Sequence, residues 1–393
     1  MSKFNNFPVP KKGKLRAVLK RPASMKTKAW KQVKYVRSPD AVPEVRMDRC
    51  KWKRSLAQIL QSSPSTLVKM LREDGLLHKW EGHVCPRCCR GTLGGLQQLG
   101  GLLKHRCSAK KCHTYINPHH AHPIFVDHWG SSSTPLATQA CLLMLLLNRV
   151  SHPTIHRLLH VNHKSIEDME KRLGQLRERW VRNKEKDIKF GQGGKWQDVE
   201  ADEATFDKKV VNGQLHWEQW CGIVQRGKPQ TLVLHRLKPV ISKLRAPGPG
   251  AIRKVEWQPL AVKWLQHRDI ILHTDSAKSY AIKVKGVLHD RVIHKKKRVK
   301  VNGEWKWLTP KYVELHKHVL PGSKKAITVK KGTQIIDRCW RFLKDRLNIN
   351  QNCKVGSSLL RIRLRSAQYE YWHRGHDLWL ATGSLVQWFL LKA

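Results

Sequence analysis

The stretch Val199-Glu-Ala-Asp-Glu203 brings carboxylates into a segment that alternates like a β-strand. The alternation predicts a strand over residues 196–206, in which Asp198, Glu200 and Asp202 share one face. An acidic face breaks the rule that a central strand buries apolar side chains, and such departures are expected at functional sites. The structural alternative is an exposed edge strand whose acids are solvated.

The segments that follow keep the strand pattern and then change period. Short runs separated by the turn signals Asn212-Gly213 and Gly227-Lys-Pro229 predict an antiparallel meander. An apolar run before Asp275 is typical of a buried parallel strand. The predicted elements after the first strand are strands at 216–224 and 231–236, a helix at 257–266, a strand at 269–274 and an amphipathic helix at 335–347. This is the element order of the ribonuclease-H-like fold, so we expect an α/β domain over residues 196–347.

Three aspartates, Asp202, Asp275 and Asp337, are the candidate catalytic residues. One lies in a strand, one directly follows the neighbouring strand, and one lies near the start of the amphipathic helix. Two-metal phosphoryl transfer needs a few carboxylates around two ions about 3.5–4 Å apart, and only a fold can bring distant acids together. The structural alternatives are a helix N-cap for Asp275 and a favourable first-turn charge for Asp337. Glu203 points to the opposite face and is the less favoured ligand.

The chain is strongly basic, with 76 Lys and Arg against 29 Asp and Glu, and a net charge of +47. Such a charge favours nucleic-acid binding through counterion release. Carboxylates in such a chain are expected to bind Mg²⁺ or Mn²⁺, because a metal lets acids approach phosphate without repulsion. The simpler alternative is a basic protein that binds polyanions nonspecifically.

Several protein classes are disfavoured by the sequence. The most apolar run, Leu142–Leu147, is far shorter than the ~20 residues of a membrane span. The basic N-terminus has no apolar stretch typical of a secretory signal. Half of the ten cysteines lie between Cys85 and Cys112, which indicates metal ligands in a reducing compartment. We expect no membrane partner, and a location in the nucleus of a eukaryote or otherwise in the nucleoid or cytoplasm.

A cysteine cluster predicts a zinc ribbon over residues 83–123. The predicted ligands are Cys85, Cys88, Cys107 and Cys112, which would surround Zn²⁺ as four thiolates. The second pair is separated by four residues rather than two, and His105 and His113 are alternative ligands. Cys89 is a spare thiol. The following histidines read as a polar loop rather than a second metal site; they are His119, His120 and His122.

The remaining segments read as helices and basic regions. Residues 51–82 form a helical leader, and residues 133–185 are all-helical. In the latter, a short helix, a turn and a basic helix are typical of a helix-turn-helix, although plain helical bundles share the pattern. The residues expected to be exposed on the basic helix are Lys171, Arg172, Arg177 and Arg179, of which the first two are candidate DNA contacts.

The two terminal segments and one basic loop complete the predicted domain organisation. Residues 1–50 are predicted to be a basic flexible arm and residues 348–393 a C-terminal extension. A dense basic loop is expected to bind the phosphates of DNA; it comprises Lys295, Lys296, Lys297, Arg298 and Lys300.

From about Leu67 to about Trp372, the chain resembles the DDE transposases of the Merlin superfamily and related bacterial insertion-sequence transposases with an N-terminal zinc ribbon. The leader, the cysteine knuckle, the start of the helical segment and the three acidic segments carry the resemblance in order. The matching strings are Leu67-Val-Lys-Met-Leu-Arg, Cys85-Pro-x-Cys88, Pro135-Leu, Val199–Glu203, His273-Thr-Asp275-Ser with Tyr280, and Gly332-Thr-Gln-Ile-Ile-Asp337-x-x-Trp340-x-x-Leu-Lys344. His316 stands where the family commonly has a His.

The resemblance implies a DNA transposase that cuts element ends and joins them to target DNA. Asp202, Asp275 and Asp337 would bind Mg²⁺, the ribbon and helices would recognise the ends, and the protein would form a homo-oligomer on DNA. The family usually has Glu at the third position, and the shorter side chain of Asp337 moves a carboxylate by about an ångström, which can cost ~10²-fold in rate. Two rivals therefore stay open: a transposase-derived DNA-binding protein that has lost cleavage, and a zinc-dependent, non-enzymatic regulator that binds nucleic acid. The roles of Cys89, Glu203 and His316 are open.

Overall fold

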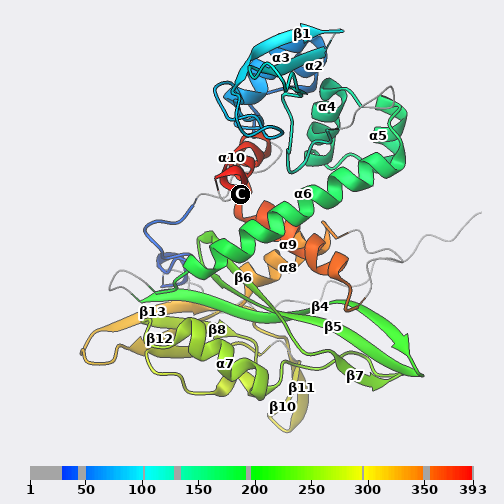
Figure 1. The fold of residues 1–393 in the computed structure, drawn as a ribbon. Coiled ribbons are helices and arrows are strands. Elements are labelled where there is room, and N and C mark those ends of the chain that lie inside the picture. The colour runs from blue at the N-terminus through cyan, green and yellow to red at the C-terminus, as the bar shows by residue number, and fades with distance from the viewer. Residues whose placement is uncertain are drawn as a thin grey trace, which may run out of the picture. The chain divides into compact units, whose positions relative to one another are not determined.

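The structure is a computed structural model that divides into two compact units. It describes residues 29–42, 50–100, 102–127, 134–191, 196–293, 296–347 and 355–391. Figure 1 shows the ribbon. Within the described residues, the smaller unit contains residues 29–35 and 315–330. In it, strands β12 (Glu314–Val319) and β13 (Ala326–Lys331) pair, and the Lys330 ammonium lies 4.3 Å from the ring centroid of Trp30.

A mixed sheet organises the larger unit, in the strand order β6-β5-β4-β8-β9, with β7 paired to β5. Strands β4 and β5 and strands β5 and β6 are antiparallel, whereas β8 runs parallel to β4 and β9 parallel to β8. The strands are β4 (Gln197–Val211), β5 (Gln214–Gln225), β6 (Lys228–Arg236), β7 (Val240–Lys243), β8 (Ile270–Thr274) and β9 (Val287–Arg291). The predicted meander and parallel strand are confirmed, and β7 and β9 are additional.

The turn between β4 and β5 shows why the meander forms. Asn212 and Gly213 have φ angles of 48° and 72°. Two consecutive left-handed residues suit a hairpin turn whose twist matches that of the strands, and Asn-Gly is the favoured pair for it.

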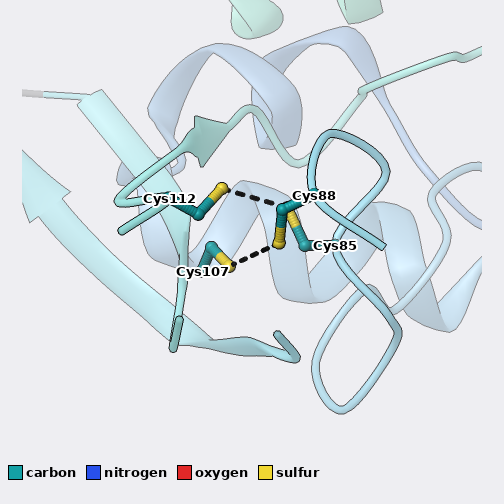
Figure 2. Close-up of side chains that lie close together, drawn as sticks. All are labelled: Cys85, Cys88, Cys107 and Cys112. Carbon is teal, nitrogen blue, oxygen red and sulfur yellow. Dashed lines mark hydrogen bonds between the residues drawn. The ribbon is translucent and has the colours of Figure 1, made fainter. Parts of the chain in front are cut away.

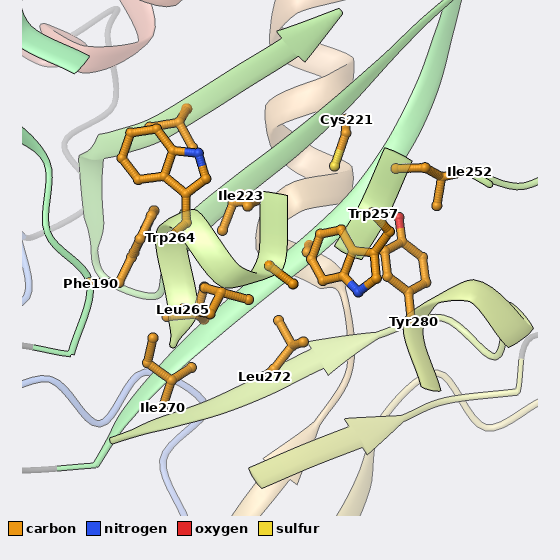
Figure 3. Packing of buried hydrophobic residues seen from close by; sticks show 14 of the residues in the cluster. Phe190, Cys221, Ile223, Ile252, Trp257, Trp264, Leu265, Ile270, Leu272 and Tyr280 are labelled. Carbon is orange, nitrogen blue, oxygen red and sulfur yellow. The ribbon is translucent and has the colours of Figure 1, made fainter. Parts of the chain in front are cut away.

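One face of the sheet holds the main apolar core. Val199 and Ala201 alternate with the acids of β4 and point to this face, where they meet helix α7 (Lys254–Leu265). Figure 3 shows Trp257 and Trp264 of this helix lying over strand side chains such as Ile223. The strand alternation expected from the sequence is therefore confirmed, and Asp198, Glu200 and Asp202 face the other side.

Two helices lie on the acidic face and its edge. Helix α8 (Gln334–Lys344) contacts β4 and β5, and helix α9 (Ser358–Trp372) contacts β6. Gln368 and Trp372 of α9 both donate to the backbone oxygen of Leu232, at 2.8 and 2.9 Å. Side chains of α9 thus bond an outward carbonyl group of β6, which is an edge strand. Without α9, this edge would be open to pairing with another chain.

The cysteine region and the helical segments lie before the sheet in the chain. The cysteine region has a three-stranded sheet of β1 (Leu93–Leu99), β2 (Leu102–Cys107) and β3 (Tyr115–Ile116). The helices are α2 (Leu56–Gln61), α3 (Pro64–Glu73), α4 (Leu136–Leu147), α5 (His152–Leu159) and α6 (His163–Lys184). α6 lies along α9 (Figure 1).

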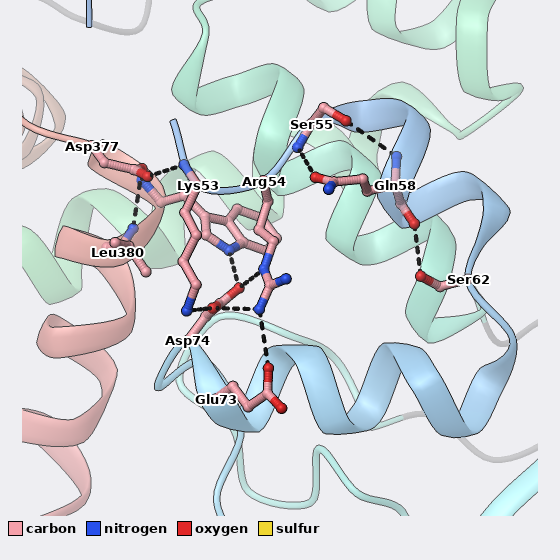
Figure 4. A network of polar contacts seen from close by, with 10 residues as sticks. Lys53, Arg54, Ser55, Gln58, Ser62, Glu73, Asp74, Asp377 and Leu380 are labelled. Atoms are coloured by element: carbon pink, nitrogen blue, oxygen red, sulfur yellow. Dashed lines mark hydrogen bonds and ion pairs between the residues drawn. The ribbon is translucent and has the colours of Figure 1, made fainter. Parts of the chain in front are cut away.

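Helix α10 (Leu378–Leu390) joins the C-terminal segment to the leader. Asp74, at the end of α3, accepts hydrogen bonds from Trp379 Nε1 at 2.9 Å and from Arg54 Nε at 2.7 Å (Figure 4). A Cβ added at Gly383 would lie 1.8 Å from the Asp74 backbone oxygen, so glycine is needed where the two segments meet. Residues 355–391, expected in an extension, therefore pack on the leader, on α6 and on β6.

Three expectations from the sequence need correction. Arg177 is buried rather than exposed, because its Nη1 donates to Glu370 Oε1 at 2.8 Å in the α6–α9 contact. The predicted basic loop is instead a hairpin of β10 (Lys297–Val301) and β11 (Glu304–Leu308), because Asn302-Gly303 forms a tight turn. Part of the predicted flexible arm is held on the sheet, since the Val42 N–H donates to the Gly227 carbonyl at 2.8 Å.

Candidate functional site

The four predicted cysteine ligands converge. Their Sγ atoms all lie within 4.8 Å of one another (Figure 2). The Sγ atoms of Cys85 and Cys112 are 3.8 Å apart, and those of Cys88 and Cys107 are 3.7 Å apart. Four thiolates around Zn²⁺, with Zn–S bonds of about 2.3 Å, form a tetrahedron with S–S edges of about 3.8 Å. The donor set therefore fits a tetrahedral zinc ion.

Local backbone geometry explains how these cysteines are held. Cys85 and Cys107 are buried with Leu93 and Ile116 in a small core. The Gly91 N–H donates to Cys88 Sγ at 3.4 Å, and this backbone contact leads the causes that lower the pKa of Cys88 to about 6. A thiol with such a pKa is easily ionised, as a metal ligand must be.

The alternative ligands have other partners. His105 Nδ1 lies 2.7 Å from the Gly94 carbonyl oxygen, and its Nε2 lies 3.0 Å from Arg72 Nη2. His113 Nδ1 lies 3.0 Å from Arg106 Nη2. Cys89 is exposed and outside the cluster.

One of the nearby histidines, His122, is accounted for by structural contacts. His122 accepts the N–H of Phe125 at 2.8 Å through Nδ1, and its Nε2 lies 2.8 Å from the carbonyl oxygen of Leu76. Burial lowers the pKa of His122 to about 3, so the ring is neutral and fixes the exit of the cysteine region against the leader.

The three candidate aspartates occupy the places expected of them. Asp202 lies in β4, Asp275 directly follows β8, and Asp337 lies in the first turn of α8. The parallel register pairs Glu200 with His273. Continuing that register by two residues brings Asp202 level with Asp275, at the end of β8.

A buried carboxylate that the sequence did not single out fixes the helix carrying Asp337. Glu200 Oε2 accepts the backbone N–H groups of Ile335 and Ile336, at 2.7 and 2.9 Å. Its other oxygen accepts Arg226 Nε at 2.6 Å, and Arg226 Nη2 donates to the Gly332 carbonyl at 2.8 Å. Glu200 thus supplies the cap that α8 lacks from its own sequence, since Thr333 makes no side-chain cap bond.

A glycine and a tryptophan set the distance between α8 and β4. Gly222 is the cross-strand partner of Asp202, and a Cβ there would lie 2.5 Å from the ring of Trp340. The absent side chain lets Trp340 lie against the sheet and donate its Nε1–H to Asp202 Oδ2 at 3.0 Å. In the sequence, the Asp337-x-x-Trp340 spacing indicates that both side chains lie on one face of the helix, the face that meets the sheet.

The carboxylates are near enough to repel one another. Burial and the charges of Glu203, Asp337 and Asp275 raise the pKa of Asp202 well above its ordinary value, although the Trp340 hydrogen bond opposes the shift. Mutual repulsion of this kind is the electrostatic environment that a cation relieves.

The aspartates do not form a set for a single ion. Among the described residues, these aspartates are not a group in which one oxygen from each lies within 4.8 Å of the others, whereas the Sγ atoms of the four cysteines are such a group. One oxygen of Asp275 accepts the Ala277 N–H at 2.9 Å, as the N-cap alternative expected. Thr333 Oγ1 lies 3.3 Å from Asp337 Oδ2.

The other acids of β4 have structural partners. Glu203 accepts the hydroxyl of Tyr280 and, at 3.1 Å, the N–H of Ile252, which ties β4 to the turn that follows Asp275. Asp198 accepts Arg37 Nε at 2.7 Å, and its other oxygen lies 3.0 Å from His273 Nε2. Each oxygen of these two carboxylates therefore already has a partner within the protein.

The predicted DNA contacts lie apart along the chain, on a helix and a hairpin. Lys171 is exposed and Arg172 partly exposed on α6, whose opposite side buries the predicted apolar residues Met169, Leu173 and Leu176. The exposed cations near the hairpin are Lys296, Arg298 and Lys300. Lys297 lies in β10, and Lys295 lies outside the described residues. His316 lies on β12 in the smaller unit, where its Nδ1 is 3.2 Å from His318 Nε2.

None of the helices in the described part of the chain combines the length and the apolar character needed to cross a lipid bilayer. Comparisons with known protein families, with curated proteins and with solved structures found no match to this chain.

Proposed function

We propose that the protein is a DNA transposase of the DDE type, which cuts DNA at the ends of an element and transfers the freed ends to target DNA. The observation that carries the proposal is the arrangement of Asp202, Asp275 and Asp337. A strand, the end of its parallel neighbour and a helix packed on both β4 and β5 each present one carboxylate. The proposed partner is DNA, bound by a homo-oligomer in the nucleus or nucleoid.

The sheet supports a ribonuclease-H-like fold for this part of the chain. Three antiparallel strands are followed by a helix and by two strands that continue the sheet beyond β4, in the order β6-β5-β4-β8-β9. This topology leaves the middle of β4 and the end of β8 side by side, which is where a carboxylate pair is required.

The spacing of the aspartates favours two ions over one. Oxygens bound to a single Mg²⁺ at 2.0–2.1 Å lie within about 4.2 Å of one another, whereas ligands of two ions about 3.5–4 Å apart can lie farther apart. In this arrangement Asp202, Asp275 and Asp337 would together hold the ions. Bound Mg²⁺ or Mn²⁺ would activate the attacking oxygen and stabilise the leaving oxygen.

The chain's own residues position these carboxylates. Trp340 orients Asp202, and Glu200 with Arg226 holds α8 so that Asp337 faces the sheet. Glu203 keeps the turn after Asp275 in place through Tyr280. The cysteine cluster, in our proposal a zinc ribbon, would recognise element ends together with α5 and α6.

Cleavage of DNA tests the proposal. A duplex carrying the sequences that flank this gene is incubated with Mg²⁺ and either the native protein or Asp202→Asn. We expect metal-dependent cuts at defined positions, reduced by roughly 100-fold or more in the variant, because the amide lacks the charge that binds the metal and the reacting groups are then no longer held in position. Asp207→Asn, on the same strand, is the matched control and should cut normally.

A second candidate is a transposase-derived DNA-binding protein without cleavage activity. The observation that favours it is Asp337, whose side chain is shorter than the usual Glu of the family that the chain resembles. Asp337→Glu decides between the two: if the shorter acid limits the reaction, the variant cuts faster, by up to ~10²-fold. A protein that binds its flanking sequences tightly, yet cuts neither as native chain nor as Asp337→Glu, would be the non-catalytic form.

A third candidate, a zinc-dependent regulator, is favoured only by the cysteine cluster. It predicts no preference for the flanking sequences over unrelated duplex.

A further inference from the structure

The hairpin of β10 and β11 carries two exposed tryptophans and two cations on one face. Its register pairs Arg298 with Trp307 and Lys300 with Trp305. Directly paired residues point to the same side of an antiparallel ribbon, and residues two apart on a strand do so too. These four side chains therefore form a single surface, the Trp–cation face.

Among the tryptophans that the structure describes, these two indoles are the most exposed. Trp305 is 58% and Trp307 65% exposed, whereas Trp257 in the sheet core is fully buried. Indole rings bury large apolar areas and dominate cores and interfaces, so two rings left in water on one face need a reason.

The hairpin does not need both rings for its turn. Asn302 and Gly303 have φ angles of 52° and 83°, the left-handed pair that closes a tight hairpin. The structural alternative is cross-strand stabilisation, since the Arg298 guanidinium lies 5.1 Å from the ring centroid of Trp305. This contact involves one ring and leaves the exposure of Trp307 unexplained.

We propose that the Trp–cation face binds unpaired bases of single-stranded nucleic acid. Each indole offers a flat surface on which a base stacks, and Arg298 and Lys300 lie beside the rings to pair with phosphates. The charge of the face suits a polyanion and disfavours a basic partner such as a second copy of this chain, whose net charge is +47.

The geometry favours an opened strand over a duplex. Two residues along a strand advance about 6.8 Å, which is twice the 3.4 Å spacing of stacked bases in one DNA strand. The two indoles would therefore contact bases that have separated from each other, or alternate bases. The bases of an intact duplex are already stacked on both sides and leave no room for an indole.

The inference rests on the nucleic-acid partner of the proposed function, but not on cleavage. Its test therefore uses binding alone, with no added Mg²⁺. A fluorescent oligothymidylate of about 16 nucleotides, the upper site size for one single-strand-binding fold, is titrated with the full chain, and anisotropy is recorded. A duplex of the same length and an oligouridylate serve as the second and third probes.

The decisive variant is Trp305→Val with Trp307→Val, because valine retains the strand preference and removes the ring. We expect its affinity for the single strand to fall about tenfold for each indole removed, while its affinity for the duplex changes by less than about twofold. Val301→Thr, on the opposite face of the hairpin, should leave both affinities unchanged. Equal losses for uridylate and thymidylate would place the recognition in the bases rather than the sugar.

Two further variants separate stacking from charge and from folding of the hairpin. Trp305→Phe with Trp307→Phe should retain most single-strand binding, because phenylalanine still presents a ring. Arg298→Ala with Lys300→Ala should weaken both probes and lower the salt slope for the single strand by about 1.4, or 0.7 for each phosphate contact. The inference is overturned if the valine variant binds the single strand as well as the native chain, or if it loses single strand and duplex equally.

Discussion

Glu200 accepts the backbone N–H of Ile335 at 2.7 Å, which joins β4 to the first turn of α8 across 135 residues of chain. Because the same carboxylate also pairs with buried Arg226, one side chain sets both where α8 begins and how it lies on the sheet. Asp337 lies in this same first turn. The candidate site therefore depends on a residue that is not a candidate ligand.

Replacing Glu200 with Gln should destabilise the protein by about 3–5 kcal/mol, because the change leaves a buried guanidinium without its charge partner. The amide also turns N–H groups toward the N–H groups of α8. Urea denaturation measures the loss. Asp345→Asn, an exposed change at the other end of α8, is the control and should be neutral. Equal stability of Glu200→Gln and the native protein would contradict the anchoring role.

Replacing Cys88 with Ser should weaken zinc binding, whereas Cys89→Ser should not. The neighbours differ in one respect that matters: Cys88 Sγ is in the cluster of four, and Cys89 is exposed outside it. We expect the native chain and Cys89→Ser to retain one zinc ion per chain against a chelator that strips Cys88→Ser. Zinc analysis and limited proteolysis over residues 83–123 give the readout. Equal retention in both variants would show that the cluster is not the zinc site.

Replacing Gly383 with Ala should destabilise the protein by ~1–3 kcal/mol, because the new methyl group overlaps the Asp74 backbone oxygen. The adjacent change Ser384→Ala is the control, since Ser384 is exposed and donates to the Leu380 carbonyl of its own helix. Alanine has a higher helix propensity than serine, so this control should be neutral or stabilising. Thermal unfolding compares the two, and a neutral Gly383→Ala would mean that α10 does not contact the end of α3 this closely.

The stability of the folded protein should fall in acid, because Glu370 then becomes protonated. Burial alone would raise its pKa, but Arg177, Arg149 and Arg346 outweigh burial and hold the pKa below its ordinary value of 4.5. A carboxyl whose pKa is lowered by folding stabilises the folded state above pH 4.5 and loses that contribution as the pH falls through the folded pKa.

Glu370→Gln should therefore cost about 3–5 kcal/mol at pH 7, as expected for a charge removed from a buried ion-pair cluster. The difference from the native protein should shrink as the pH drops below 4.5, because the native carboxyl becomes neutral too. Denaturation curves at several pH values measure the difference. A gap that stays constant down to the acid limit of the folded state would contradict the role of these arginines.

Much of the sheet could be predicted because its signals are local. Asn212-Gly213 marks a turn by its left-handed backbone, and the alternation around Asp202 sets the faces of β4. The cysteine cluster could be predicted for the same reason, since cysteines at short spacings have few uses other than metal binding in a reducing compartment.

The long-range partners of the site could not be predicted. Nothing in the sequence distinguishes Glu200 from the other acids of β4, and only the folded chain shows that it caps α8. Arg177 looks solvent-exposed on its helix, because the pattern of α6 does not reveal that α9 and Glu370 cover it. Trp305 and Trp307 alternate like core residues of a sheet, yet both rings are largely exposed among the described residues.

The position of α10 has a consequence for biosynthesis. The described elements that α10 contacts all precede it in the chain. One of them is α3, whose Asp74 accepts a hydrogen bond from Trp379. A ribosome must therefore add 305 residues after Asp74 before Trp379 can reach it. A nonsense codon shortly before Leu378 would release a chain with the carboxylate of Asp74 lacking its indole donor and an apolar surface open to water, so such a gene copy yields aggregates or degradation products rather than a shortened working protein.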